Sequence, residues 1–107
     1  MLIYNVTVKI DQDVHLDWLQ WMRETHIPRV MQTGKFDDYR ICRMMHEEPD
    51  GVTYAVQYFC PDLAAMYAYQ QEHAKSLQAE VSERFPGKFV IFRTLMEVIW
   101  TSTASNP

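Results

Sequence analysis

Hydrophobic and polar residues alternate along the first ten residues of the chain. In Leu2–Ile10 one set of alternate positions is apolar or aromatic throughout, whereas the other includes Asn5, Thr7 and Lys9. Successive side chains of a strand point to opposite faces, so this alternation predicts a half-buried β-strand. The aromatic and β-branched segment Val52–Cys60 predicts a second strand of the same kind.

Two longer segments carry apolar residues at helical spacing. The first follows the opening strand and predicts a helix to about His26. Pro28 disfavours helical backbone at the residue before it, so we expect the helix to end there and a short further turn to run to Gly34. Pro61 opens the second helix, and the Pro86–Gly87 pair ends it.

The remaining apolar segments predict two more strands, Phe36 to about Glu47 and Lys88 to about Trp100. The resulting order is β-α-β-β-α-β, which predicts an α+β, ferredoxin-like fold: a four-stranded antiparallel sheet with two helices on one face. We expect one domain over residues 1–100. The tail, residues 101–107, has too little apolar content to pack, so we expect it to be disordered.

One short pattern occurs twice. GKFDDYR at Gly34–Arg40 is repeated as GKFVIFR at Gly87–Arg93, each time where a helix gives way to a strand. The repeat predicts two similar halves. It also predicts that the two arginines, at the same point of their strands, lie on one face of the sheet.

The alternation assigns residues to the two faces of the sheet. We expect the following residues under the helices: Tyr4, Val6, Val8, Ile41, Tyr54, Val56, Phe92 and Val98. The opposite face would carry Asn5, Thr7, Arg40, Cys42, Met44, Gln57, Phe59, Ile91, Arg93, Leu95 and Glu97. Because this second face is partly apolar, we expect a second copy of the chain to cover it and form a homodimer.

Composition narrows the choice of partners and compartment. The 107 residues are 48% apolar with a net charge of -4, and they contain no run of basic residues. We therefore expect no nucleic-acid partner. The N-terminal segment alternates instead of forming a continuous apolar block, so we expect neither a signal peptide nor a membrane span, and a cytoplasmic location.

Two cysteines flank the turn EEPDG. The hairpin register places Cys42 and Cys60 on opposite faces and too far apart for a disulfide, so we expect two reduced thiols. Neither lies in the Cys-x-x-Cys or Cys/His clusters typical of zinc sites, and we expect no metal.

The chain resembles a known family over nearly its whole length. The residues that carry the resemblance are IYNVTVKI at Ile3–Ile10, HIP at His26–Pro28 and GVTYAVQYF at Gly51–Phe59. They resemble small bacterial proteins known only as a domain of unknown function. The organisation is also similar to the dimeric α/β-barrel superfamily, which includes antibiotic-biosynthesis-type monooxygenases, haem-degrading proteins, lactone isomerases and stress-responsive proteins. This resemblance implies the fold and a dimer in which two sheets face each other, and it carries no catalytic residue across.

His26 is the first candidate for chemistry, because it stands at the expected helix break, where its side chain could reach the mouth of a pocket. Histidine exchanges protons near neutral pH. The alternative is a histidine that packs near Trp21 at the helix end. A haem-ligating role for His26 or His73 would need an open apolar cavity beside the ring.

The paired arginines are the second candidate. Arg40 and Arg93 could bind a carboxylate or stabilise an enolate, since guanidinium offers a fixed fork of donors. The alternative is that they cross the dimer interface to Glu97, Asp38 or the backbone. The side chains that we expect to bind a ligand beside them are Asn5, Thr7, Gln57, Trp18 and Tyr39.

Three functions remain open. The first is a cofactor-free enzyme acting on a small aromatic or polyketide-like compound, with His26, Arg40 and Arg93 as catalytic residues. The second is a non-catalytic small-molecule binder or sensor, and the third is a dimeric interaction module. The sequence contains no Gly-rich phosphate loop and no HExxH motif.

Overall fold

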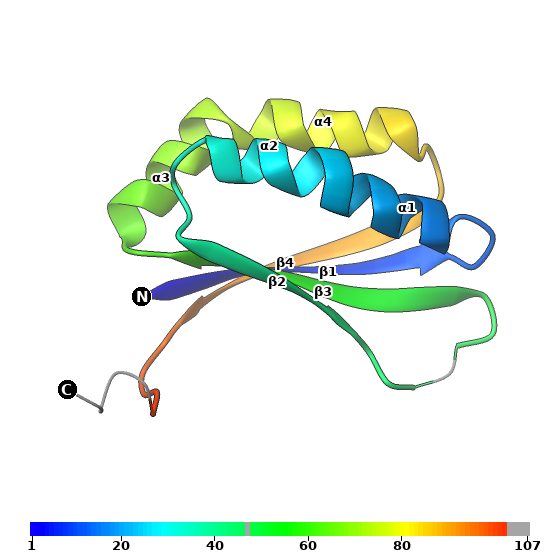
Figure 1. Ribbon diagram of the computed structural model, residues 1–107, viewed down its shortest axis with the longest axis horizontal. Helices are drawn as coiled ribbons and strands as arrows, with labels where there is room; N and C mark the ends of the chain where they lie inside the picture. Colours follow the sequence, from blue (N-terminus) through cyan, green and yellow to red (C-terminus); the bar gives the residue numbers. More distant parts are fainter. Residues whose placement is uncertain (47, 103–107) are drawn as a thin grey trace.

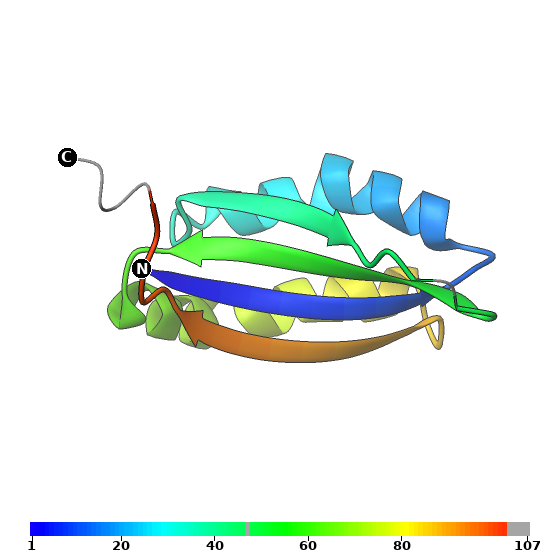
Figure 2. The same cartoon turned by 90° about the horizontal axis from the view of Figure 1, so that it is seen from below.

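The computed structural model describes residues 1–46 and 48–102. Its elements are β1 (Leu2–Asp11), α1 (His15–Trp21), the π-helical turn η1 (Met22–His26), α2 (Ile27–Gln32), β2 (Asp38–Arg43), β3 (Gly51–Cys60), α3 (Leu63–Glu72), α4 (Ala74–Arg84) and β4 (Phe89–Glu97). The strands form one antiparallel sheet in the order β2-β3-β1-β4. All helices cover the same face of that sheet (Figures 1 and 2), which confirms the ferredoxin-like α+β fold.

We predicted that the first helix breaks before Pro28, but the first helical region continues through it. The backbone passes from α1 through η1 into α2, and Ile27 keeps helical angles of φ -61° and ψ -43° directly before the proline. Proline lacks an N–H and its ring crowds the carbonyl one turn earlier. The carbonyl that the proline ring would crowd lies within the wider π turn. Such turns are common at functional sites. This turn ends at His26 and directs that side chain inward.

The second helical region is interrupted where we predicted one helix. Asp62 is the N-cap of α3, and its side chain accepts a hydrogen bond of 2.8 Å from the backbone N–H of Ala65. His73, with φ -129° and ψ -34°, leaves the helical region, and α4 starts afresh after it. The two segments therefore cover different parts of the sheet (Figure 1).

Both glycines of the repeat end a helix, as predicted. Gly34 has φ +75° and Gly87 has φ +70°, a left-handed conformation that glycine adopts without steric cost. The strands that follow are shorter than expected, since β2 ends at Arg43 and β4 at Glu97. The expected strand end at residue 47 and the expected disorder of residues 103–107 fall outside the described residues.

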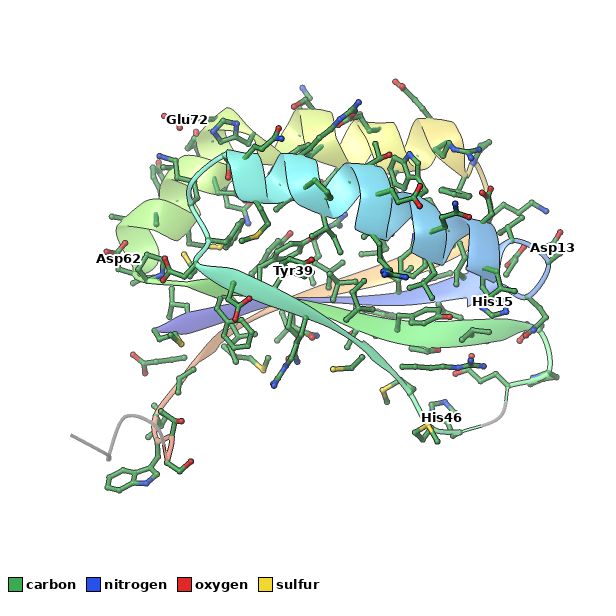
Figure 3. All side chains as sticks on the ribbon, in the orientation of Figure 1. Asp13, His15, Tyr39, His46, Asp62 and Glu72 are labelled. Atoms are coloured by element: carbon green, nitrogen blue, oxygen red, sulfur yellow. The ribbon has the colours of Figure 1, made fainter. Side chains whose placement is uncertain are left out.

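A continuous core fills the space between helices and sheet (Figure 3). At one end it contains four packed rings, Tyr4, Phe36, Tyr58 and Tyr69, with centroids 4.8–6.2 Å apart. Among the described helices, none is both long and apolar enough to cross a lipid bilayer.

The predicted faces of β4 are wrong. Ile91, Arg93 and Leu95 pair across the sheet with Val8, Val6 and Tyr4, whose side chains point toward the helices. These three residues therefore lie on the helix side, as does Glu97, which pairs with the buried Leu2. The alternate residue Phe92 lies on the opposite, open face, where 69% of its surface is exposed.

The reason for the error is a one-residue slip between the two repeats. In the second repeat Phe89, Ile91 and Arg93 alternate regularly on the helix side. In the first repeat Phe36 packs against Tyr4 and Tyr39 pairs with Tyr58, so both point to the helix side although they are three residues apart. This odd spacing moves Arg40 to the open face. Equivalent positions in the sequence thus lie on opposite faces of the sheet.

Candidate functional site

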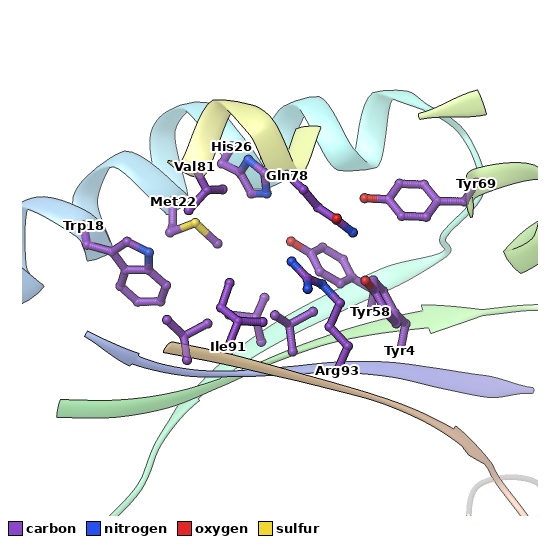
Figure 4. Close-up of a pocket in the computed structure, with 13 residues that line it drawn as sticks. Tyr4, Trp18, Met22, His26, Tyr58, Tyr69, Gln78, Val81, Ile91 and Arg93 are labelled. Atoms are coloured by element: carbon purple, nitrogen blue, oxygen red, sulfur yellow. The ribbon is translucent and has the colours of Figure 1, made fainter. Parts of the chain in front are cut away.

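A cavity lies between the sheet and the helices, on the side of α4 and β4 (Figure 4). Its volume is about 40 Å³, enough for about three water molecules at roughly 10–15 Å³ for each water centre. The lining residues are Tyr4, Val6, Val8, Trp18, Met22, His26, Val56, Tyr58, Tyr69, Gln78, Val81, Ile91 and Arg93. They come from three strands and from both helical regions, so the whole fold forms this site.

The two ends of the cavity differ in polarity. At one end, Figure 4 shows the side chains of Tyr4, Tyr58, Tyr69, Gln78 and Arg93 pointing toward one another. The other end is formed mainly by apolar side chains, those of Trp18, Met22, Val81 and Ile91. A few polar groups beside an apolar wall are typical of small-molecule sites.

His26 lies at the cavity with only 8% of its surface exposed. Its ring stacks on Trp21 with a centroid separation of 5.3 Å, so the packing that we considered as the alternative is also present. Burial, with a smaller contribution from the charge of Arg29, lowers the pKa of His26 from 6.5 to about 4. The ring is therefore neutral at pH 7.

The tyrosine hydroxyls remain protonated. Burial is the main cause that raises the pKa of Tyr58 and Tyr69, and neighbouring tyrosines add to it. Burial also raises the pKa of Tyr4, against the charge of Arg93 and hydrogen bonding to Arg93 and Gln78. All three hydroxyls can therefore donate hydrogen bonds at neutral pH.

Arg93 brings a positive charge to the polar end. Within residues 1–46 and 48–102 no carboxylate lies close enough to form an ion pair with it. Its charge instead acts on the hydroxyls of Tyr4 and Tyr69. The cavity thus has a cation at its edge and no counter-charge, which favours an anion.

Two buried polar atoms at the cavity have no hydrogen-bond partner among the described residues, Nε1 of Trp18 and Nδ1 of His26. Buried polar groups are normally paired, because an unpaired one costs about 1–3 kcal/mol. Both atoms belong to cavity-lining residues. A water molecule or a ligand atom within hydrogen-bond distance would satisfy them.

Several predicted site residues lie on the open face instead. Arg40 donates from Nε to Oε1 of Gln57 at 2.7 Å, and its guanidinium lies 5.3 Å from the ring centre of Phe59. Nε2 of Gln57 donates to Oδ1 of Asn5, whose Nδ2 donates to Oγ1 of Thr7. These four residues form a polar chain across the sheet, separate from His26 and Arg93. We therefore assign Arg40 no part in the cavity.

Of the other expected ligand-binding residues, the cavity includes Trp18, whereas Tyr39 lines a separate shallow groove beside α1. Gln78 also lines the cavity and was not among the predicted site residues. Its signal was its position four residues after Ala74, on the buried stripe of α4. A polar residue on such a stripe is a candidate for a site.

A haem does not fit the cavity as it stands, because 40 Å³ holds a few waters and no porphyrin. His73 does not line the cavity. Among the described residues, no group of three or more His, Cys, Asp or Glu side chains is arranged to hold a metal ion. The acidic loop beside His46 is instead bridged by ion pairs between Lys9 and both Glu48 and Asp50.

Comparison with known protein families identifies the family of this chain. Residues 1–99 match the model of a family described as a domain of unknown function, DUF4286. The chain belongs to this family. No curated protein matches it by sequence.

Solved structures show the same fold at low sequence identity. The heme-degrader MhuD from Mycobacterium tuberculosis, with two hemes bound, is 12% identical with a TM-score of 0.69, over 94% of this chain and 98% of that one. A dimeric ferredoxin-like protein from an uncultured marine organism is 10% identical with a TM-score of 0.68, over 94% and 96%. A putative antibiotic biosynthesis monooxygenase from Deinococcus radiodurans is 11% identical with a TM-score of 0.65, over 94% and 95%. At these identities the similarity concerns the fold alone.

Proposed function

We propose that this protein binds a small organic anion in the cavity and acts on it as a cofactor-free acid/base enzyme. The observation that carries the proposal is that the buried, neutral His26 lines the same cavity as Arg93, an exposed cation without an ion pair among the described residues. Arg93 would hold a carboxylate or a developing enolate. The hydroxyls of Tyr4 and Tyr58 would donate hydrogen bonds to the same charge.

The size of the cavity limits which part of the ligand enters it. A cavity of about 40 Å³ accepts an anionic head group. The body of an aromatic or polyketide-like compound would enter only if side chains at the edge, Gln78 and Arg93, move outward. Gln78 is partly buried and Arg93 is exposed, so such movement is sterically possible.

A non-catalytic binder is the second candidate, and the pKa of His26 favours it. General bases work best when their pKa lies near the operating pH, whereas a histidine with a pKa of about 4 is a weak base. A bound anion would raise that pKa by its negative charge, because an opposite charge favours the protonated ring. A protein whose His26 stays neutral in the complex would bind without moving a proton.

The test uses benzoate as a small anion, with the neutral benzamide as its counterpart. Isothermal titration should show benzoate binding that weakens at least tenfold in Arg93→Gln, because a charge-assisted hydrogen bond contributes about 1.5–3 kcal/mol. Arg40→Gln is the matched control, since it removes the same charge from the open face and should leave binding unchanged. Equal binding of both ligands, or equal loss in both variants, would refute anion binding at Arg93.

Acid/base action is tested separately with an enolisable acid such as phenylpyruvate. Exchange of its benzylic protons, which are α to the keto group, for deuterium, followed by NMR, should be accelerated by the parent protein and lost in His26→Gln. If the protein binds phenylpyruvate without accelerating the exchange, the enzymatic function is wrong and the non-catalytic binder remains.

We also propose that the protein is a homodimer in the cytoplasm. The exposed apolar side chains of Val90, Phe92 and Met96 on the open face support the dimer. Two free cysteines support a reducing compartment.

A further inference from the structure

An apolar groove lies beside the cavity, between α3 and β4. Its volume is about 510 Å³, and we call it the α3–β4 groove; its lining residues are Leu63, Ala64, Met66, Tyr67, Gln70 and Leu95. Leu63 and Tyr67 are 67% and 68% exposed, and Leu95 is 46% exposed. Neighbouring apolar side chains that are exposed to solvent in this way are typical of a binding surface.

The groove starts at the polar end of the cavity. Leu95 follows Arg93 by two residues on the same face of β4, so the two side chains stand about 7 Å apart. On the facing helix α3, Met66 lines the groove and Tyr69, one turn later, lines the cavity. Tyr4, which is close to Arg93, pairs across the sheet with Leu95. The two sites are therefore neighbours along the same strand and the same helix.

We infer that the ligand is an aliphatic carboxylate, whose head group reaches Arg93 and Tyr4 while its hydrocarbon chain lies in the α3–β4 groove. This inference rests on the proposed function, namely that the cavity binds organic anions. The small cavity has room for the head group only. The hydrocarbon chain therefore lies outside it, and the neighbouring apolar groove is the surface that would bury the chain. From Leu63 to Gln70, α3 offers about 10 Å of length to the chain.

A second copy of the protein is the competing occupant, because Ile99 and Trp100 are exposed and apolar. The segment Ile99–Ser102 contains no charged side chain, however. It would cover the groove and leave Arg93 without a counter-ion. An aliphatic carboxylate supplies both the apolar chain and the negative charge, so the charge at the end of the groove favours it.

The test is an NMR titration of the protein with acetate, butyrate, hexanoate and octanoate, all below micelle-forming concentrations. The dissociation constant should fall with chain length, by up to about fourfold for each methylene group that the groove buries. Leu95→Ser and Tyr67→Ser should weaken octanoate binding and leave acetate binding unchanged. Leu16→Ser is the matched control, since it alters an exposed leucine on α1, away from the groove.

The outcomes separate the two proposals. If the carboxylates bind through Arg93 with no effect of chain length, or if Leu95→Ser affects acetate and octanoate equally, the groove is not the chain site. If Leu95→Ser instead lowers the mass measured by sedimentation and leaves the titrations unchanged, a second copy occupies the groove and the inference is wrong. If no carboxylate binds at any length, or Arg93→Gln changes nothing, the proposed anion site itself is wrong.

Discussion

His26 combines a candidate chemical role with a cost to stability. The folded protein holds its pKa at about 4, below the ordinary value of 6.5, mainly because the ring is buried. Between these two values the unfolded chain binds a proton that the folded protein does not, so stability falls as the pH falls. The difference corresponds to a loss of about 3 kcal/mol on going from pH 7 to below pH 4.

We therefore expect His26→Gln to flatten the pH dependence of the free energy of unfolding between pH 6.5 and pH 4. Urea unfolding at several pH values measures this slope. The variant's free energy of unfolding also differs from that of the parent at every pH, because the contact with Trp21 is lost. Only the slope with pH tests the pKa of His26. An unchanged slope in His26→Gln would mean that the ring has the same pKa in the folded and unfolded states, which would contradict the lowered pKa of the buried ring.

His26 and Arg93 were both predicted as site residues, but their position at one cavity was not. The hypothesis from the sequence placed Arg93 beside Arg40 on the open face, whereas the structure places it with His26 on the helix side. The segment Phe89–Met96 is apolar in both phases of its alternation, so no pattern within it decides which face is buried. The pairing with β1 decides, and that pairing joins residues far apart in the chain.

At the scale of elements, the sequence correctly predicted the features that depend on interactions between neighbouring residues. The alternation found β1 and β3, and the two glycines marked helix ends, because each depends on the conformation of a few residues. The turn η1 was not predicted. Proline normally favours a break, and packing of the helix against the sheet is what keeps Ile27 helical here. Such packing is a property of the fold and cannot be read from the neighbouring residues.

The hairpin of β2 and β3 predicts how the two thiols react. Cys42 is exposed on β2, whereas Cys60, at the end of β3, is buried, and burial raises the pKa of its thiol. Because the thiolate is the reactive form, Cys60 should react with a thiol reagent only after unfolding, whereas Cys42 should react in the folded protein, more slowly where a second copy covers the open face. Titration before and after adding denaturant, without reductant, should count one thiol and then two. Two fast thiols would contradict the burial of Cys60, and none after unfolding would contradict the proposed reducing compartment.

At the scale of the whole molecule, the open face of the sheet still calls for a partner, although β4 presents other residues than expected. Phe92 takes the place that the sequence analysis gave to Leu95, and Val90 and Met96 lie on the same face beside it. Leaving apolar area in water forgoes about 25 cal/mol for each Å². A second copy related by a twofold axis covers the same patch on both chains at once.

Phe92→Asp should therefore dissociate the dimer with little effect on the fold of each chain. The side chain is largely exposed in the single chain, so an aspartate there meets water when the protein is monomeric and an apolar partner surface when it is dimeric. Sedimentation velocity at micromolar concentration measures the change in mass, and circular dichroism checks that the fold persists. Leu16→Asp is the matched control, because it places the same charge on an exposed leucine of α1, on the other side of the sheet and away from the α3–β4 groove. A parent protein that sediments as a monomer, or a Phe92→Asp variant that stays dimeric, would show that the open face is not the contact and that the polar chain from Arg40 to Thr7 lies in water.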